Sequence, residues 1–196
     1  MKLTFYAFLF LFINCKSEPI PVKKEIDYSK QFTKIKNFAT KHNYNQNIAF
    51  MVDYSLHSGL SRFFVVDLKT DKIIDKGLVC HGSCKGDNQS DYAKKFSNIN
   101  NSYCTSLGFA LIGKRDYSKW GKHYKYWLDG LEKSNHKMRS RVVVLHAWDG
   151  VPDEDCYPTS IATSWGCPTV SIKFLDRLDV ILKQNKKILL YSFDGN

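Results

Sequence analysis

Two residues in the last third of the chain are of the types that carry out nucleophilic catalysis. His146 ends the apolar run 141–146, and Cys167 lies within Ser-Trp-Gly-Cys-Pro at 164–168. A cysteine attacks as its thiolate, and a neighbouring imidazole can lower the pKa of the thiol and move its proton. A histidine and a cysteine at this separation also fit a structural role, so the pair alone leaves both interpretations open.

The turn around the cysteine is suited to stabilising a developing negative charge. Pro168 and Thr169 follow Cys167, and a helix is predicted to begin at Ser171. Backbone N–H groups at such a turn can point at an oxyanion, and Gly166 allows a substrate to approach closely. The pattern therefore favours acyl-transfer chemistry on a thiol.

Short strands and two helices must position these residues. Apolar residues recur at helical spacing over 28–43 and 171–184, with Ser171 as a suitable N-cap. Apolar or alternating runs predict strands at 49–52, 63–66, 73–79, 107–112, 124–128, 141–146 and 188–193. The β-branched run 141–146 is predicted to be a central strand, and 148–163 a loop. The sum is one β-rich α+β domain with an N-terminal and a C-terminal helix.

The first 15 residues have the pattern of an export signal. Lys2 precedes an apolar run at 3–13, which is too short for a membrane span of about 20 helical residues. The segment resembles a bacterial lipoprotein signal that ends at a lipidated Cys15, although Asn14 stands where a small residue is usual. An ordinary cleaved signal peptide is the alternative. We expect residues 1–15 to be the signal, 16–27 a tether and 28–196 the domain of an exported, periplasmic, membrane-anchored protein.

Export to an oxidising compartment bears on the remaining cysteines. They are Cys80, Cys84, Cys104, Cys156 and Cys167. The odd number leaves at least one thiol unpaired. We favour a Cys84–Cys104 disulfide, worth about 3 kcal/mol through loop closure, with Cys80 and Cys156 either paired or free. A zinc site that adds His81 to Cys80, Cys84 and Cys104 is the alternative, but its ligand spacing is loose and we expect no metal.

The composition excludes several classes of protein. The chain has 196 residues, of which 43% are hydrophobic, enough for a core and too many for wholesale disorder. It carries 29 Lys and Arg against 19 Asp and Glu, a net charge of +10. The basic residues are scattered, and no nucleic-acid-binding motif is present, so we expect no nucleic-acid partner.

The spacing of His146 and Cys167 resembles the active-site motif of the L,D-transpeptidase family. In that motif a histidine precedes Ser/Thr-His-Gly-Cys by fourteen to seventeen residues, and here 147–163 separate His146 from Ser-Trp-Gly-Cys. Other segments match a lipoprotein-like branch of the family in order, namely 80–82, 96–98, 106–109, 128–132 and 141–146. The resemblance covers about residues 60–193 and implies a single β-sandwich or barrel domain of the L,D-transpeptidase type.

The resemblance also implies a reaction and a role for each motif residue. Such enzymes cut the bond before the terminal D-amino acid of a peptidoglycan tetrapeptide stem through a cysteine thioester. An amine then resolves the thioester in a transpeptidase, and water does so in a carboxypeptidase. Cys167 would be the nucleophile, and His146 the general base. The N–H groups of Gly166 and Cys167 would bind the oxyanion, and Ser164 would brace the loop that carries Trp165. We expect His146 to hydrogen-bond Cys167 and to lower the pKa of its thiol, without a cofactor and in a monomer.

The sequence departs from the family pattern at two places. Trp165 replaces the usual histidine, and Pro168 and Thr169 stand where most members carry a polar residue or an arginine. Recognition of a substrate carboxylate would then fall to another basic residue, such as Arg115 or Arg141.

Three alternatives remain open at this point. His81 matches a histidine of the branch and either lines the cleft or makes structural hydrogen bonds. The missing second histidine motivates a catalytically inert, peptidoglycan-binding lipoprotein with the same fold. A papain-like peptidase is a third possibility, but it places the cysteine before the histidine, the reverse of the order here.

Overall fold

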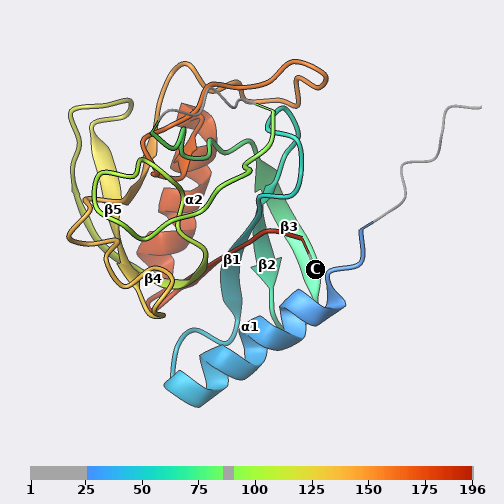
Figure 1. Cartoon of the computed structure of the whole chain (residues 1–196). Coiled ribbons are helices and arrows are strands. Elements are labelled where there is room, and N and C mark those ends of the chain that lie inside the picture. Colours follow the sequence, from blue (N-terminus) through green and yellow to red (C-terminus); the bar gives the residue numbers. More distant parts are fainter. Residues whose placement is uncertain (1–25, 86–90, 196) are drawn as a thin grey trace, which may run out of the picture.

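The computed structural model describes residues 26–85 and 91–195, which form a β-rich α+β domain with a helix near each end (Figure 1). The signal segment, Cys15 and the tether up to residue 25 lie outside the described residues. The elements follow in the order α1 (Ser29–His42), β1 (Ile48–Asp53), β2 (Phe63–Asp67), β3 (Lys72–Gly77), β4 (Gly108–Tyr117), β5 (Tyr124–Gly130), β6 (Val144–Ala147), β7 (Thr169–Val170), α2 (Ile172–Gln184) and β8 (Leu189–Phe193).

All eight strands belong to one sheet whose two ends meet. Their order is β3-β2-β1-β8-β4-β5-β6-β7, and only the β1–β8 and β6–β7 pairs are parallel. The segment after β3 returns to β7, because Val79 bridges Val170 and the Cys80 N–H donates to the Thr169 carbonyl at 2.8 Å. The sheet is therefore nearly closed, as a barrel-like domain requires.

Helices α1 and α2 cover opposite faces of the sheet. Along β1, Ala49 and Met51 pack with α1, whereas Phe50 and Val52 pack with α2. Strands β2 and β8 alternate in the same way, and Figure 1 shows the two helices separated by β1 and β2. Strands buried on both faces read as continuous apolar runs, which explains why no polar alternation marks them in the sequence.

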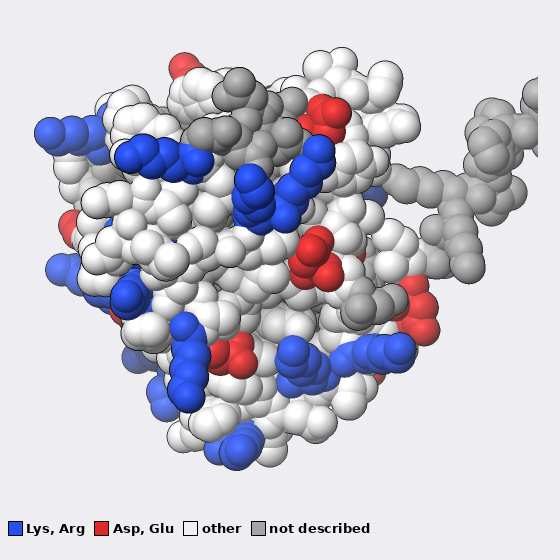
Figure 2. Space-filling view, in the orientation of Figure 1, with Lys and Arg blue, Asp and Glu red and all other residues white. Residues whose placement is uncertain are grey.

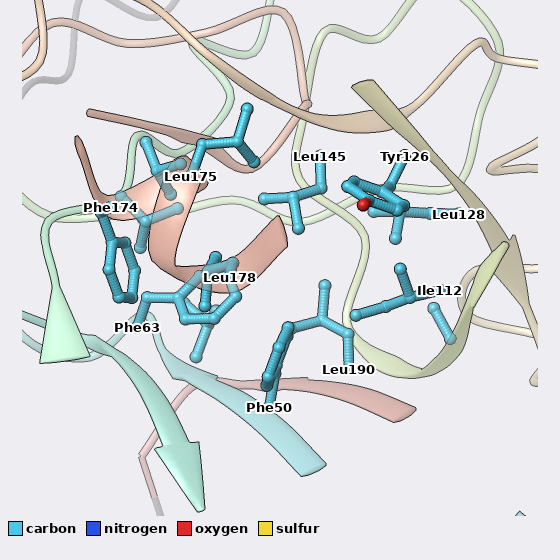
Figure 3. Packing of buried hydrophobic residues seen from close by; sticks show 14 of the residues in the cluster. Phe50, Phe63, Ile112, Tyr126, Leu128, Leu145, Phe174, Leu175, Leu178 and Leu190 are labelled. Carbon is cyan, nitrogen blue, oxygen red and sulfur yellow. The ribbon is translucent and has the colours of Figure 1, made fainter. Parts of the chain in front are cut away.

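Helix α2 forms the centre of the larger core (Figure 3). Phe174, Leu175 and Leu178 point from it toward residues of the strands, including Phe63 and Leu145. The helix begins as predicted, since the Ser171 hydroxyl accepts a hydrogen bond from the Phe174 N–H at 3.1 Å. This cap also fixes the chain just after Thr169, and so fixes the end of the segment that carries the cysteine.

The strand prediction for 141–146 is wrong in length and position. Strand β6 begins only at Val144. It is next to last in the strand order, beside the edge strand β7, and is not a central strand. Val142 has a φ of 58° and is 54% exposed, because it closes a turn that precedes the strand. A β-branched residue rarely adopts a positive φ. The residue type of Val142 therefore predicts a strand at a position where the backbone turns. Strand β4 also runs past Gly113 to Tyr117, and the two-residue β7 was too short to predict.

The charges are distributed over the surface without a single basic stripe on the face that Figure 2 presents. Lys and Arg side chains lie there among uncharged residues, with acidic groups between them. Within residues 26–85 and 91–195, no helix has both the length and the apolar character needed to cross a membrane.

Candidate active site

The segments that carry the two candidate catalytic residues lie side by side where β6 pairs with β7. These strands are parallel, with His146 opposite Thr169, and Cys167 lies two residues before Thr169. The long excursion between the strands thus returns the cysteine to the histidine, as the sequence motif requires. Strand pairing, and not the loop itself, sets this geometry.

The Cys167 thiol lies against the backbone that enters β6. The Val144 N–H donates to Sγ at 3.4 Å, and Sγ lies 3.7 Å from the Val142 carbonyl oxygen. Burial raises the pKa of the thiol above its usual value, and the Val144 N–H and the nearby Arg141 oppose that rise. The expectation of a lowered pKa is therefore wrong for this state of the protein, because desolvation outweighs the favourable contacts.

His146 is held as a neutral imidazole with its basic nitrogen toward Thr169. Its Nδ1 lies 3.0 Å from the Ala147 carbonyl oxygen, and its Nε2 lies 3.0 Å from the Thr169 hydroxyl. A carbonyl oxygen only accepts, so Nδ1 carries the proton and Nε2 accepts from Thr169. Burial lowers the pKa of the imidazole. Neither ring nitrogen hydrogen-bonds Cys167, contrary to the expectation from sequence.

Ser164 braces the loop that carries the cysteine. Its hydroxyl donates to the Cys167 carbonyl at 2.7 Å and accepts from the Gly166 N–H at 3.1 Å. The Gly166 N–H is thereby occupied and is not a ready oxyanion donor, which corrects one expected role. The Cys167 N–H makes no hydrogen bond within the described residues, so it is the donor that remains.

Gly166 is required by its backbone conformation and by a close neighbour. Its φ is 103°, and a Cβ at this position would lie 2.7 Å from the Cys104 carbonyl oxygen. Only glycine adopts this conformation without strain. The loop of the nucleophile therefore packs directly on the segment that ends at Cys104.

That neighbouring segment is held by the disulfide between Cys84 and Cys104, the pair favoured from sequence. Cys80 and Cys156 are free. With Cys84 and Cys104 bonded to each other, the alternative zinc set loses two thiolates. No group of three or more His, Cys, Asp or Glu side chains suited to a metal occurs in the part of the chain described.

Comparison with known proteins decides the family. The model of the L,D-transpeptidase catalytic domain matches residues 22–191, which is most of the chain. The chain belongs to the L,D-transpeptidase catalytic domain family. No curated protein matches it.

Solved structures similar to this L,D-transpeptidase domain share little sequence with it. Bd1075 of Bdellovibrio bacteriovorus is 16% identical with a TM-score of 0.48, covering 78% of this chain and 49% of its own. The helical cell shape determining protein Pgp2 of Campylobacter jejuni is 13% identical with a TM-score of 0.45, covering 82% and 56%. The L,D-transpeptidase of Xylanimonas cellulosilytica is 11% identical with a TM-score of 0.44, covering 80% and 68%. The chain spans about half the length of the first two.

The two arginines considered for carboxylate recognition in this L,D-transpeptidase domain are both engaged elsewhere. Arg115 bonds Asp179 of α2 at 2.9 Å and lies over the Tyr124 ring. Arg141 lies beside Gly166, but its guanidinium donates to the segment 97–106. The Arg141 guanidinium therefore has no free fork for a substrate carboxylate. Arg115 bonds Asp179 through Nε, and its side chain is 43% exposed.

Arg62, a buried arginine that the sequence analysis did not single out, is linked through His81 to the loop of the nucleophile. Arg62 is 0% exposed and donates to the Val79 and Leu56 carbonyls. It also donates to His81 Nδ1 at 2.8 Å, and the His81 carbonyl accepts from the Ser164 N–H at 2.7 Å. His81 is 1% exposed, so it makes structural hydrogen bonds and does not line the cleft surface. Its motif position alone did not distinguish these roles.

Replacing Arg62 with methionine is expected to lower the free energy of unfolding by about 3 kcal/mol. The substitution leaves buried carbonyl acceptors without donors, which costs about 1–3 kcal/mol of stability for each acceptor. Removal of the buried charge restores part of that free energy. Urea unfolding measures the effect. Arg139→Met is the control, because its ion pair with Asp129 is exposed and worth less than about 1 kcal/mol. Equal effects of the two substitutions would contradict the support role.

Trp165, in place of the usual histidine, points outward instead of bracing the loop. It is 77% exposed, and its ring centroid lies 5.6 Å from that of Tyr103. Tyr103 precedes Cys104, so the pair joins the two loops at the site. Both rings are exposed and lie beside the loop that carries Cys167.

Proposed function

We propose that this protein is a peptidoglycan L,D-transpeptidase or L,D-carboxypeptidase that acts on tetrapeptide stems through a thioester on Cys167. One observation carries the proposal. In an L,D-transpeptidase catalytic domain, a free cysteine and a neutral histidine lie at the paired ends of β6 and β7. That is the arrangement of a thiol nucleophile with a base on rigid elements.

The acylation half-reaction follows from the atoms at the site. His146 Nε2 first gives up its hydrogen bond from the Thr169 hydroxyl. It then accepts the proton of the Cys167 thiol. The sulfur attacks the carbonyl carbon before the terminal D-amino acid, and the Cys167 N–H donates to the oxygen that becomes negative. The C–N bond then breaks, and the imidazolium returns the proton to the departing amine. The product is a thioester and a free D-amino acid.

The second half-reaction restores the thiol. An acceptor amine, or water, loses a proton to His146 as it attacks the thioester carbonyl. The C–S bond breaks, and the sulfur regains the proton from the imidazolium. An amine acceptor yields a cross-link between stems, and water yields a trimmed tripeptide stem. Each pathway uses the same residues, since the two differ only in the acceptor.

We further propose that the protein is exported and anchored in a membrane through a lipidated Cys15. The support is the sequence of residues 1–15, and the apolar run that precedes the cysteine. An anchor of this kind places the domain beside peptidoglycan, where its substrate is found.

A catalytically inert peptidoglycan-binding protein is the second candidate, and two observations favour it. His146 Nε2 is occupied by Thr169, and burial raises the pKa of the Cys167 thiol. Both features keep the thiol protonated in this state. An inert domain would bind stem peptides without forming a thioester.

Mass spectrometry of muropeptides tests these possibilities together. Incubation of tetrapeptide muropeptides with the full-length protein is expected to give either cross-linked dimers or tripeptide stems, with a transient Cys167 adduct in the intact-mass spectrum. Unchanged muropeptides and no adduct, from protein shown to be folded, would contradict the enzymatic proposal and support the inert binder.

A further inference from the structure

We infer that the Arg141 guanidinium, and not the His146 imidazole, is the positive charge that stabilises the Cys167 thiolate. The inference rests on the proposed role of Cys167 as nucleophile. It assigns Arg141 a positioning and electrostatic role, and leaves His146 as a neutral base. Separate groups would then perform the two tasks that one imidazole usually combines in thiol enzymes.

The first support is the place of Arg141 beside the nucleophile. It directly precedes Val142, whose carbonyl oxygen lies 3.7 Å from Sγ. A Cβ built on Gly166 would lie 3.3 Å from Arg141 Nη2, so the guanidinium abuts the residue before Cys167. Arg141 therefore belongs to one of the two backbone segments that flank the sulfur, and its guanidinium lies beside the other.

The second support is the way in which the guanidinium is held. Its Nη1 donates to the Ser97 carbonyl and the Ser106 hydroxyl, and its Nη2 donates to the Ser102 hydroxyl and the Cys104 carbonyl. These acceptors use all four hydrogens of the two Nη atoms, which leaves no fork for a substrate carboxylate.

The charge of the guanidinium is nevertheless not neutralised by its partners. All four acceptors are uncharged, and no Asp or Glu in the described part of the chain forms an ion pair with Arg141. The favourable electrostatic interaction between Arg141 and Cys167 opposes the rise that burial causes in the thiol pKa. The guanidinium is thus a cation fixed beside Gly166 by its hydrogen bonds to the segment 97–106.

The third support is the state of His146 and of the other ionisable groups that face the sulfur. The Nδ1 proton of His146 is donated to a carbonyl, Nε2 accepts from Thr169, and burial disfavours the charged ring. Lys125 on β5, opposite His146, is a second cation that acts on Cys167, more weakly than Arg141. Tyr54 is buried with a raised pKa and stays neutral.

This arrangement would keep a partly buried thiol reactive without an imidazolium. An imidazolium loses its charge as the pH rises through its pKa, whereas a guanidinium keeps its charge throughout the working range. The thiolate therefore keeps its electrostatic partner at neutral and alkaline pH. The neutral His146 is at the same time free to accept protons.

The rate of alkylation of Cys167 against pH tests the inference. Full-length protein is treated with iodoacetamide between about pH 7 and 12, a range that reaches past the raised pKa of the thiol. Modification is read at the Cys167 peptide by mass spectrometry, which separates it from Cys80 and Cys156. We expect Arg141→Met to raise the midpoint by about one pH unit and to slow alkylation at pH 7 about tenfold. Arg141→Lys should retain most of the wild-type rate. His146→Ala should leave the midpoint unchanged.

Two further variants keep the result decisive. Arg139→Met, two residues away and paired with Asp129, is the matched control and should not shift the profile. Arg141→Gln keeps donors at the site without the charge, and should shift the midpoint as the methionine variant does. A loop distorted by lost hydrogen bonds would instead change the plateau rate at high pH without moving the midpoint.

An unshifted midpoint in both Arg141→Met and Arg141→Gln would overturn the inference. A shift caused by His146→Ala and not by the Arg141 variants would overturn it in favour of an imidazolium partner. No peptidoglycan is needed in this experiment, so its outcome is independent of whether muropeptides are processed. Failure of the inference and failure of the proposed function are therefore distinguishable.

Discussion

Cys167→Ala is expected to abolish turnover of tetrapeptide muropeptides and to leave the fold intact. The thioester cannot form without the sulfur, and water attack promoted by the remaining groups is too slow to be observed beside the wild type. The thiol contributes little to packing, since its contacts are the Val144 N–H and the Val142 carbonyl. We expect a loss of about 1 kcal/mol or less in the free energy of unfolding.

The measurement pairs product formation with thermal unfolding. Cys156→Ala is the control, because Cys156 is the other partly exposed free cysteine and its thiol contacts the Thr159 carbonyl away from β6. It should keep wild-type turnover. Product formation by Cys167→Ala at the wild-type rate would show that Cys167 is not the nucleophile.

His146→Ala is expected to lower turnover by about 10²–10⁴-fold, the usual contribution of a general base. Because burial lowers the pKa of His146, its ring is neutral at pH 7 and stays so to lower pH than a free histidine. Wild-type turnover should therefore decline on the acid side only below a pH of about 6.5, the ordinary histidine value. The alanine variant should lack that acid limb.

The control for this substitution is His136→Ala. His136 lies on an exposed turn, where its Nδ1 contacts Asn98 and the Lys133 carbonyl. Its removal should leave both turnover and the pH profile unchanged. If His146→Ala retained more than about a tenth of wild-type turnover, proton transfer would have to pass through another group, with the Thr169 hydroxyl as the nearest.

Most of the fold follows from local sequence pattern. The two helices were predicted from apolar spacing, and the Ser171 cap from the residue type, because both depend on neighbours three or four positions away. Strands β1, β2 and β8 were visible as short apolar runs. That the segments of His146 and Cys167 lie side by side was also predictable, since a motif fixes residue types and spacing.

The turn before β6 could not be predicted from the sequence pattern in the same way. Val142 and Val143 are β-branched and apolar, and local propensity assigns them to the strand. The backbone turns there because Val143 N–H bonds the Met138 carbonyl and Arg141 N–H bonds the Lys137 carbonyl, closing the preceding loop. These turn bonds, together with the long-range bonds of the Arg141 side chain to Ser97 and Cys104, override a propensity that is worth only about 1 kcal/mol.

The chemistry of the site was decided by contacts between segments far apart in the chain. The sequence predicted Cys167, His146 and the loop braced by Ser164 as the reactive centre. Only the tertiary structure decided that the Thr169 hydroxyl bonds the imidazole and that the segment 97–106 holds the Arg141 guanidinium beside Gly166. Residue types are local, whereas the hydrogen-bond partner and desolvation of each group depend on which strands the fold brings together, and these set every pKa at the site.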